Sequence, residues 1–294
     1  MKRTLLVALA ALAALPAAAP ASFPGRNGEI VYGWTKTADT DNAGNWMAER
    51  SIRTRERLVY GCLDSSLDPA PRPAACDVEW FRDPAVSPDG SLVAFDTGAA
   101  VALVGMDGSG FRTLPTPTDD SQPAFSPSGR RLAFVRRASP TAPFRIWVRD
   151  LDTGRARPLV AGSSPDWSVR GWIAFLRDGR IHRIRPDGSG LRRLTRFRAT
   201  AISWAPDGER IALTKRDDGG AFVMRADGTA IRRIARGPYW DVTWSSDGRR
   251  LALRDFDLLV VGLRGRELEN LGEIEYSGAY STSEAYGIDW APSP

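Results

Sequence analysis

Ile202-Ser203-Trp204-Ala205-Pro206-Asp207-Gly208 is one copy of a short phrase that recurs along the chain. Other copies begin at Pro84, Pro123, Asp166 and Val242, and the glycines that end the phrase lie 37 to 42 residues apart. The last residues, 288–294, begin the phrase once more, and residues 27–32 near the N-terminus continue it. A repeat divided between the two ends of a chain predicts a closed ring.

One repeat, residues 201–235, predicts four short strands. Ile202–Trp204, Arg210–Leu213, Ala221–Met224 and Thr229–Ile234 alternate with Pro-Asp-Gly, polar and Asp-Gly connections. Short β-branched or aromatic segments at this period are typical of propeller blades, and a helical solenoid or a β-sandwich does not explain them. We therefore predict an all-β fold: a six-bladed β-propeller of four-stranded antiparallel blades.

The divided repeat predicts how the ring closes. Gly287–Trp290 supplies the innermost strand of the composite blade, and Glu29–Tyr32, Asn45–Arg50 and Arg57–Tyr60 supply its outer three strands. Ladder hydrogen bonds between the two ends would remove the open edge that a linear array leaves.

The repeated residues resemble the WD40-like repeat of TolB-type six-bladed propellers. The resemblance rests on Trp204-Ala205-Pro206-Asp207-Gly208, Ile211-Ala212-Leu213, Asp227-Gly228-Thr229 and Arg232-Arg233-Ile234, and it covers nearly the whole chain after the leader. It implies a periplasmic, non-catalytic protein that binds partners of a cell-envelope complex. TolB itself carries an additional N-terminal α/β domain, which the sequence before the first repeat is too short to supply, so the role of that domain is not carried over.

The N-terminal residues predict export. Lys2 and Arg3 precede an apolar run over residues 4–15, and Ala19-Pro20-Ala21 fits the cleavage rule of a signal peptide. We expect a signal peptide over residues 1–21, a single propeller over residues 22–294 and a periplasmic or extracellular location. No later segment is long and apolar enough to span a bilayer, and we expect a monomer.

The two cysteines, Cys62 and Cys76, lie in one Pro- and Asp-rich segment. In an exported protein they predict a disulfide that closes a long loop, and two free buried thiols are the alternative. Two Cys and one His are too few for an ordinary zinc site, so we expect no metal and no cofactor.

The sequence offers few groups for catalysis. His182 is the only histidine and aligns with the packing positions Trp147 and Phe222, so a Ser-His-Asp triad has little to build on. Six of the acidic residues stand in the repeated turns, where Asp caps its own backbone. These turn residues are Asp89, Asp107, Asp187, Asp207, Asp227 and Asp247. We expect no enzyme.

Arg192, Arg193, Arg196 and Arg198 form a basic cluster with two interpretations. One is an anion-binding stripe for nucleic acid, phosphorylated envelope polymers or acidic partners. The other is protection of an outermost strand against edge-to-edge pairing. Export and the formal charge of +5, part of which belongs to the leader, argue against nucleic acid.

Loops that break the repeat are the expected place for binding, because a rigid ring presents them together. They are residues 33–44, 60–83, 136–143 and 272–286, and they could instead only cover the closure seam. We expect a protein or a cell-envelope polymer to bind there. The candidate contact residues are Trp34, Asp83, Gln122, Asp166, Trp240, Asp241, Tyr280 and Tyr286.

The alternative function is a small-molecule or glycan site in the central channel, with catalysis of hydrolase or lyase type by carboxylates such as Asp83, Asp166 and Asp241. A channel densely lined with Asp, Glu and Asn would favour this alternative. An apolar or Arg-lined channel would favour the binding scaffold.

Overall fold

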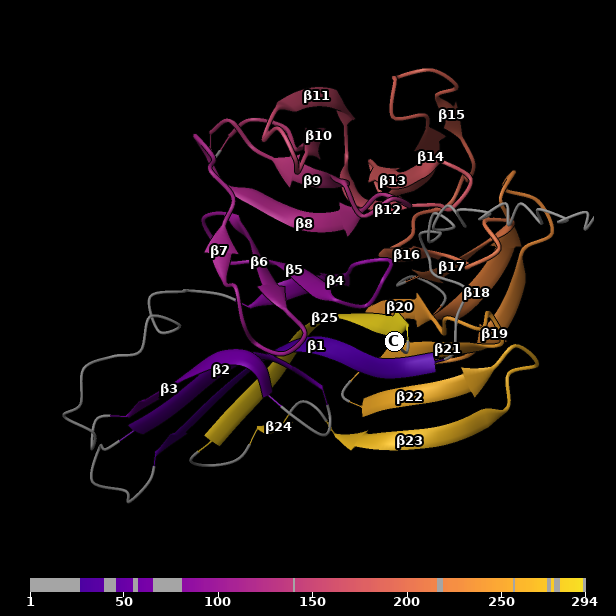
Figure 1. Ribbon diagram of the computed structural model, residues 1–294. Coiled ribbons are helices and arrows are strands. Elements are labelled where there is room, and N and C mark those ends of the chain that lie inside the picture. The colour runs from indigo at the N-terminus through magenta and orange to yellow at the C-terminus, as the bar shows by residue number, and fades with distance from the viewer. Residues whose placement is uncertain are drawn as a thin grey trace, which may run out of the picture.

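A computed structural model describes residues 27–39, 46–54, 58–65, 81–139, 141–215, 219–255, 257–273, 276–277 and 281–292. These residues contain strands and turns but no helix, and the strands form six antiparallel sheets arranged around a common centre (Figure 1). Five sheets have four strands each, as expected for propeller blades, and the sixth has five strands. The expectation of six four-stranded blades is therefore wrong by one: five are present, and the composite sheet is larger.

The five four-stranded sheets follow one another along the chain. The first contains β4 (Arg82–Val86), β5 (Leu92–Asp96), β6 (Val101–Gly105) and β7 (Arg112–Thr113). The second contains β8 (Asp120–Phe125), β9 (Arg131–Arg136), β10 (Arg145–Asp150) and β11 (Ala156–Ala161). The third contains β12 (Ser163–Trp167), β13 (Ile173–Arg177), β14 (Arg180–Ile184) and β15 (Arg192–Arg193). The fourth contains β16 (Ala201–Trp204), β17 (Arg210–Lys215), β18 (Gly220–Arg225) and β19 (Arg232–Ala235). The fifth contains β20 (Asp241–Trp244), β21 (Arg250–Arg254), β22 (Asp257–Gly262) and β23 (Glu267–Glu273).

The sixth sheet joins the two ends of the chain. Its order is β24 (Tyr276–Ser277), β25 (Ser281–Pro292), β1 (Asn27–Asp39), β2 (Trp46–Thr54) and β3 (Leu58–Ser65). Ile30 pairs with Trp290 and Val31 with Asp289, so the last strand closes against the first as the divided repeat predicted. In Figure 1 the yellow β25 lies beside the indigo β1.

The strands of this sheet are longer than the sequence predicted. β1 continues to Asp39 and β25 begins at Ser281, so residues 33–39 and 281–286 are strand rather than loop. The two strands stay paired out to Ala38 and Ser281. Period-2 alternation is weak in these segments, and cross-strand pairing supplies the order that local sequence did not reveal.

The repeated turns hold the blades in shape. The Asp207 carboxylate accepts the backbone N–H of Glu209 at 2.8 Å, and Asp187 does the same for Ser189 at 2.8 Å. Asp89, Asp107, Asp227 and Asp247 make the equivalent bond, which confirms their interpretation as turn residues.

Gly228 lies in the Asp-Gly turn between β18 and β19, and close packing as well as turn conformation requires glycine there. Its φ is +89°, and a Cβ there would meet the carbonyl oxygen of Leu194, in the preceding sheet, at 2.4 Å. The turn therefore packs backbone against the neighbouring blade, which only glycine permits.

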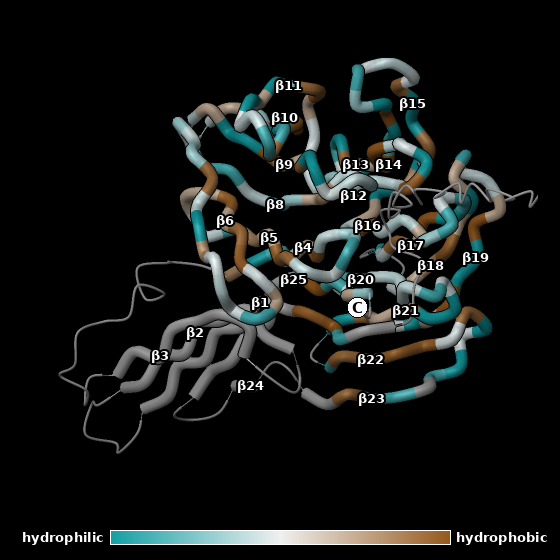
Figure 2. Tube along the Cα trace, viewed as in Figure 1, coloured by the Kyte–Doolittle hydropathy of each residue, from teal (hydrophilic) through white to brown (hydrophobic). Residues whose placement is uncertain are grey.

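Apolar side chains fill the space between adjacent sheets. Trp167 and Trp204 are each 1% exposed, and Trp244 and Trp290 are also buried, which confirms that the repeated tryptophans pack the blades. The Trp204 cluster combines residues of the third and fourth sheets, such as Ala174 and Leu213. Figure 2 shows this pattern, with apolar residues along strands such as β22 and hydrophilic residues at turns.

His182 packs within its own sheet. Its ring lies 5.5 Å from the ring of Phe175, and its Nδ1 is 3.0 Å from the carbonyl oxygen of Arg180. Burial, followed by the positive charges of Arg177 and Arg193, lowers the pKa of His182.

Three expectations lie outside the described residues. The signal peptide over residues 1–21 and Tyr280 are not described, and neither is Cys76, the expected disulfide partner of Cys62 on β3. The disulfide and the leader therefore stay predictions.

Candidate functional site

The innermost strands surround a central channel. A cavity of about 250 Å³ at one mouth is lined by Asp83, Gln122, Trp240 and Asp241, four of the predicted contact residues, together with Arg254. A cavity of about 150 Å³ in the channel is lined by Asp166 and again by Asp241. The structure thus brings five of the eight predicted site residues together.

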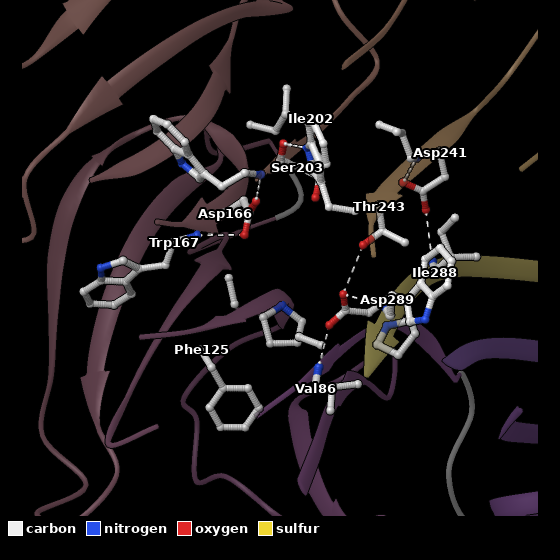
Figure 3. A pocket seen from close by; sticks show the side chains of 18 of the residues that line it. Val86, Phe125, Asp166, Trp167, Ile202, Ser203, Asp241, Thr243, Ile288 and Asp289 are labelled. Atoms are coloured by element: carbon white, nitrogen blue, oxygen red, sulfur yellow. Dashed lines mark hydrogen bonds between the residues drawn. The ribbon is translucent and has the colours of Figure 1, made fainter. Parts of the chain in front are cut away.

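Three carboxylates in the channel bridge neighbouring innermost strands (Figure 3). Asp166 on β12 accepts the backbone N–H of Trp204 on β16, and Asp241 on β20 accepts that of Ile288 on β25 at 3.1 Å. Asp289 on β25 accepts the N–H of Val86 on β4 at 2.7 Å. Each carboxylate also accepts the N–H of the residue that follows it. These side chains therefore join the blades across their junctions as well as lining the channel.

Asp289 is the carboxylate that fastens the closing strand on both sides. Besides Val86 on β4, it accepts the hydroxyl of Thr243 on β20 at 3.3 Å. Asp241 adds a second bond from β20 to β25. Closure of the ring thus depends on two acidic side chains as well as on the β1–β25 ladder.

Enclosure makes these carboxyl groups poor acids. Burial raises the pKa of Asp166 to about 7, with a further contribution from the charge of Asp289. Burial raises the pKa of Asp289 to about 6. Burial also raises the pKa of Asp241, and the positive charge of Arg254 offsets part of that rise. For Asp83, burial and then the charges of Asp241 and Asp96 raise the pKa to about 7. The channel therefore binds protons at near-neutral pH.

Asp83 differs from the other three carboxylates. Within the described residues its carboxyl accepts no hydrogen bond, whereas Asp166, Asp241 and Asp289 each accept at least two. It lines the wider cavity at the mouth, where Arg82 and Arg254 partly offset its charge. Asp83 is thus the carboxyl group with the most capacity to meet a ligand.

The mouth is built on strained backbone. Asp83, Gln122 and Ser164 have φ values of +47°, +50° and +50°, and each precedes a proline at a bulge of its innermost strand. Left-handed backbone before proline is unfavourable, and such strain clusters at functional sites. Gln122 Oε1 accepts the N–H of Ser164 at 2.8 Å, which ties two of these bulges together.

The remaining predicted residues lie on or beside the composite sheet. Trp34 is on β1 and Tyr286 on β25, and they are near neighbours in the ladder because Gly33 pairs with Tyr286. Tyr280 lies outside the described residues. Whether these three residues meet the channel-mouth group stays a prediction.

Sequence reasoning missed Asp289 and Arg254. Asp289-Trp290 repeats the Asp166-Trp167 pair at the same place in the phrase, so the register of the repeat could have found Asp289. Arg254 ends β21 and carries no comparable signal. It lies over the Trp240 ring at 5.6 Å, a contact that only the tertiary fold creates.

The described residues contain no group of three or more His, Cys, Asp or Glu side chains placed to hold a metal ion. The same residues form no helix that is long and apolar enough to cross a membrane.

Comparison with known sequences gives two partial matches to TolB proteins. The Tol-Pal system protein TolB of Rhizorhabdus wittichii is 36% identical over 73 residues, which are 24% of this chain and 17% of that protein. The TolB homolog of Chlorobium luteolum is 33% identical over 97 residues, which are 31% of this chain and 22% of that protein. No protein-family model matches the sequence.

Comparison with solved structures extends the likeness to most of the chain. TolB from Acinetobacter baumannii has a TM-score of 0.61 at 17% identity, with 92% of this chain and 68% of that chain covered. A putative TolB from Agrobacterium tumefaciens has the same TM-score at 18% identity, with 90% and 100% covered. An oligogalacturonate lyase in complex with manganese is more distant, with a TM-score of 0.52 at 14% identity over 87% of this chain and 84% of that one. The repeats, the ring of antiparallel sheets and these matches together show that the chain has a β-propeller fold similar to that of TolB.

Proposed function

We propose that this protein is an exported, non-catalytic binding scaffold that recognises a protein or a polymer of the cell envelope at the channel mouth. The observation that carries the proposal is the gathering of Asp83, Gln122, Trp240 and Asp241 around one cavity of about 250 Å³. The likeness to TolB supports an envelope partner and a periplasmic location. We count the composite sheet as the sixth blade of the ring.

The chemistry of the mouth favours recognition of a protruding polar group. Strained bulges fix Asp83 and Gln122 on the ring, and the half-buried Trp240 adds an aromatic face beside them. Rigid positioning of this kind lowers the entropy that is lost on binding. We include Trp34, Tyr280 and Tyr286 in the same surface, on the side of the composite sheet.

Two sets of variants test the surface. The full chain with Trp34, Tyr280 and Tyr286 replaced by Ala, and the full chain with Gln122→Ala and Trp240→Ala, would be used as affinity baits on an envelope extract. Mass spectrometry would compare the captured proteins with those of the unchanged chain. We expect both variants to fold. We also expect a protein that the unchanged chain captures to be lost from both variants.

A matched control uses Ser128→Ala and Trp172→Ala, which lie in or beside the turns that follow the innermost strands of the second and third sheets, away from the channel mouth. Circular dichroism would show that all the variants fold. Capture that survives every change at the mouth, or that disappears equally in the control, would contradict the proposal.

Asp83 supports the second candidate, a channel site for a small molecule or glycan with carboxylate chemistry. A carboxyl group whose pKa is about 7 is suited to donate or accept a proton near neutral pH. However, the three other channel carboxylates, Asp166, Asp241 and Asp289, are engaged with backbone N–H groups, so only Asp83 is left for such chemistry. Turnover of an oligogalacturonate by the unchanged chain that Asp83→Asn abolishes would favour this candidate over the scaffold.

A further inference from the structure

Positive charge is distributed very unevenly around the ring. Residues 120–198, which form the second and third sheets, contain 17 Arg and six Asp with no Lys or Glu, a formal charge of +11. Because the whole chain carries +5, all other residues together carry −6. One side of the propeller is therefore strongly cationic and the rest is weakly anionic, a polarity that the overall charge conceals.

The third sheet gathers five of these arginines at the edge where β13 turns into β14. We call Arg177, Arg180, Arg193, Arg196 and Arg198 the arginine cluster. Arg177 pairs directly with Arg180 across the two strands, and Arg193 pairs with His182 on the next strand out.

The residues after β15 complete the cluster. Arg180 Nε donates to the carbonyl oxygen of Arg196 at 3.3 Å, so these two residues are in contact. A Cβ at Gly179 would lie 2.9 Å from Nε of Arg198, which places Arg198 against the β13–β14 turn. Thr195 donates its hydroxyl to the carbonyl oxygen of Phe197 at 3.1 Å and so fixes the segment that carries Arg196 and Arg198.

The charge of the cluster is not neutralised within the described residues. No ion pair there involves any of the five arginines, and Arg177 and Arg180 donate to carbonyl oxygens. A carbonyl orients a guanidinium but leaves its unit charge and several of its donors available. Residues 177–198 contain two carboxylates: Asp178 lies in the β13–β14 turn itself, and Asp187 lies in the turn at the other end of β14.

His182 reports the same electrostatic environment. After burial, the charges of Arg177 and Arg193 are the main influences that lower its pKa. Arg193, Arg196 and Arg198 are exposed, so a partner in solution can reach them. The cluster therefore combines a high local charge with accessible donors.

Protection of the edge strand alone explains the cluster poorly. β15 has only two residues, Arg192 and Arg193, and a single charged residue suffices to discourage edge pairing. Arg196 and Arg198 lie beyond the strand. We propose that the arginine cluster is a docking surface for a phosphate-bearing polymer, distinct from the channel mouth.

Phosphate groups fit this surface better than isolated carboxylates. Every cation of residues 120–198 is Arg rather than Lys, and guanidinium forks bind phosphate oxygens in pairs. A polymer that carries one negative charge on each repeat unit can bring several charges at once to this side of the ring, where residues 120–198 have a formal charge of +11.

The test uses inorganic polyphosphate as the probe and the full chain as the protein. Variant one carries Arg193→Gln, Arg196→Gln and Arg198→Gln. Variant two carries Arg249→Gln, Arg264→Gln and Arg266→Gln, three exposed arginines of the fifth sheet. The two variants have the same formal charge, so they separate a local surface from overall attraction.

We expect variant one to bind polyphosphate at least about tenfold more weakly, while variant two binds within about twofold of the unchanged chain. The slope of log affinity against log salt should fall by about 0.7 for each phosphate group that an arginine no longer neutralises, as it does for single-stranded nucleic acids. Calorimetry at about 0.05 and 0.15 M salt gives both quantities.

Three results would overturn the proposal. They are equal weakening in the two variants, no measurable binding by the unchanged chain at low salt, and polyglutamate binding as tightly as polyphosphate. The last would show that any polyanion suffices and that phosphate is not selected.

Discussion

Asp289→Asn should change how the stability of this protein depends on pH. Burial raises the pKa of Asp289 from 3.8 to about 6 in the folded chain, so the folded state binds a proton that the unfolded chain has already released. A raised carboxyl pKa favours folding below the unfolded pKa, and this advantage disappears as pH rises through the folded pKa. Stability should therefore fall between about pH 4 and about pH 7.

The magnitude follows from the shift. Each proton bound on folding contributes about 1.4 kcal/mol per pH unit, so the shift at Asp289 from 3.8 to about 6 amounts to about 3 kcal/mol between a pH below the unfolded pKa and neutral pH. Asp83 and Asp166, with pKa values raised to about 7, extend the decline toward pH 8. The turn carboxylates such as Asp187 have lowered pKa values and titrate below this window.

Asp289→Asn removes the charge and keeps one acceptor oxygen. Loss of the second carboxylate oxygen as a hydrogen-bond acceptor costs about 0.5–1.5 kcal/mol at every pH. The amide does not titrate, so the contribution of Asp289 to the pH dependence of stability disappears. His182, whose lowered pKa acts in the opposite direction, is present in both proteins and cancels in the difference.

Urea unfolding followed by tryptophan fluorescence, at intervals from about pH 5 to about pH 8, measures the effect. The free energy of unfolding of the unchanged chain should fall across this range. The Asn variant should fall less steeply, by about 1.4 kcal/mol in total, because only the titration between about pH 5 and the folded pKa of about 6 lies within the range. Two parallel curves would refute the role assigned to Asp289.

Two further predictions concern packing, one between neighbouring blades and one within a blade. Gly228→Ala should destabilise the fold by more than about 2 kcal/mol, because its Cβ would meet the carbonyl oxygen of Leu194 at 2.4 Å, whereas Gly188→Ala, with a similar positive φ and no atom within 4 Å, should cost only about 1 kcal/mol of backbone strain. Equal destabilisation of the two variants in urea unfolding would contradict the close approach at Gly228. Arg136→Ala should cost about 3–5 kcal/mol, since it leaves the Asp120 carboxylate buried without the guanidinium that binds it at 2.6 and 2.7 Å. A decrease in unfolding free energy of under about 1 kcal/mol would show that the pair is dispensable.

The repeat made the fold predictable. Trp204, Pro206, Asp207 and Gly208 each have a local reason to recur, namely core packing or turn chemistry, and that reason applies wherever these residues recur in the repeat. For the composite sheet, the pairing of the two chain ends was predicted, but the length of the strands was not. Its strands run beyond the repeat because β1 and β25 support one another, which a single-strand pattern does not reveal.

The candidate site was predictable where it follows the register of the ring. Asp83, Gln122 and Asp241 stand at equivalent positions of their innermost strands, so the topology brings them to one mouth. The protonation of these carboxyl groups was not predictable, because it arises from enclosure and from carboxylates far apart in sequence. The cationic side of the ring was hidden by the overall charge and becomes visible only when charge is summed by blade.

Site-specific photo-crosslinking tests the central claim, that the channel mouth is the binding surface, most directly. A photoreactive residue would replace Trp240 at the mouth or Ser128 in the Pro-Ser-Gly turn of the second sheet, and the full chain would be irradiated with envelope extract. We predict a discrete crosslinked protein from position 240 that is absent from position 128. Crosslinks from position 128 alone, or the same adducts from both positions, would contradict the claim.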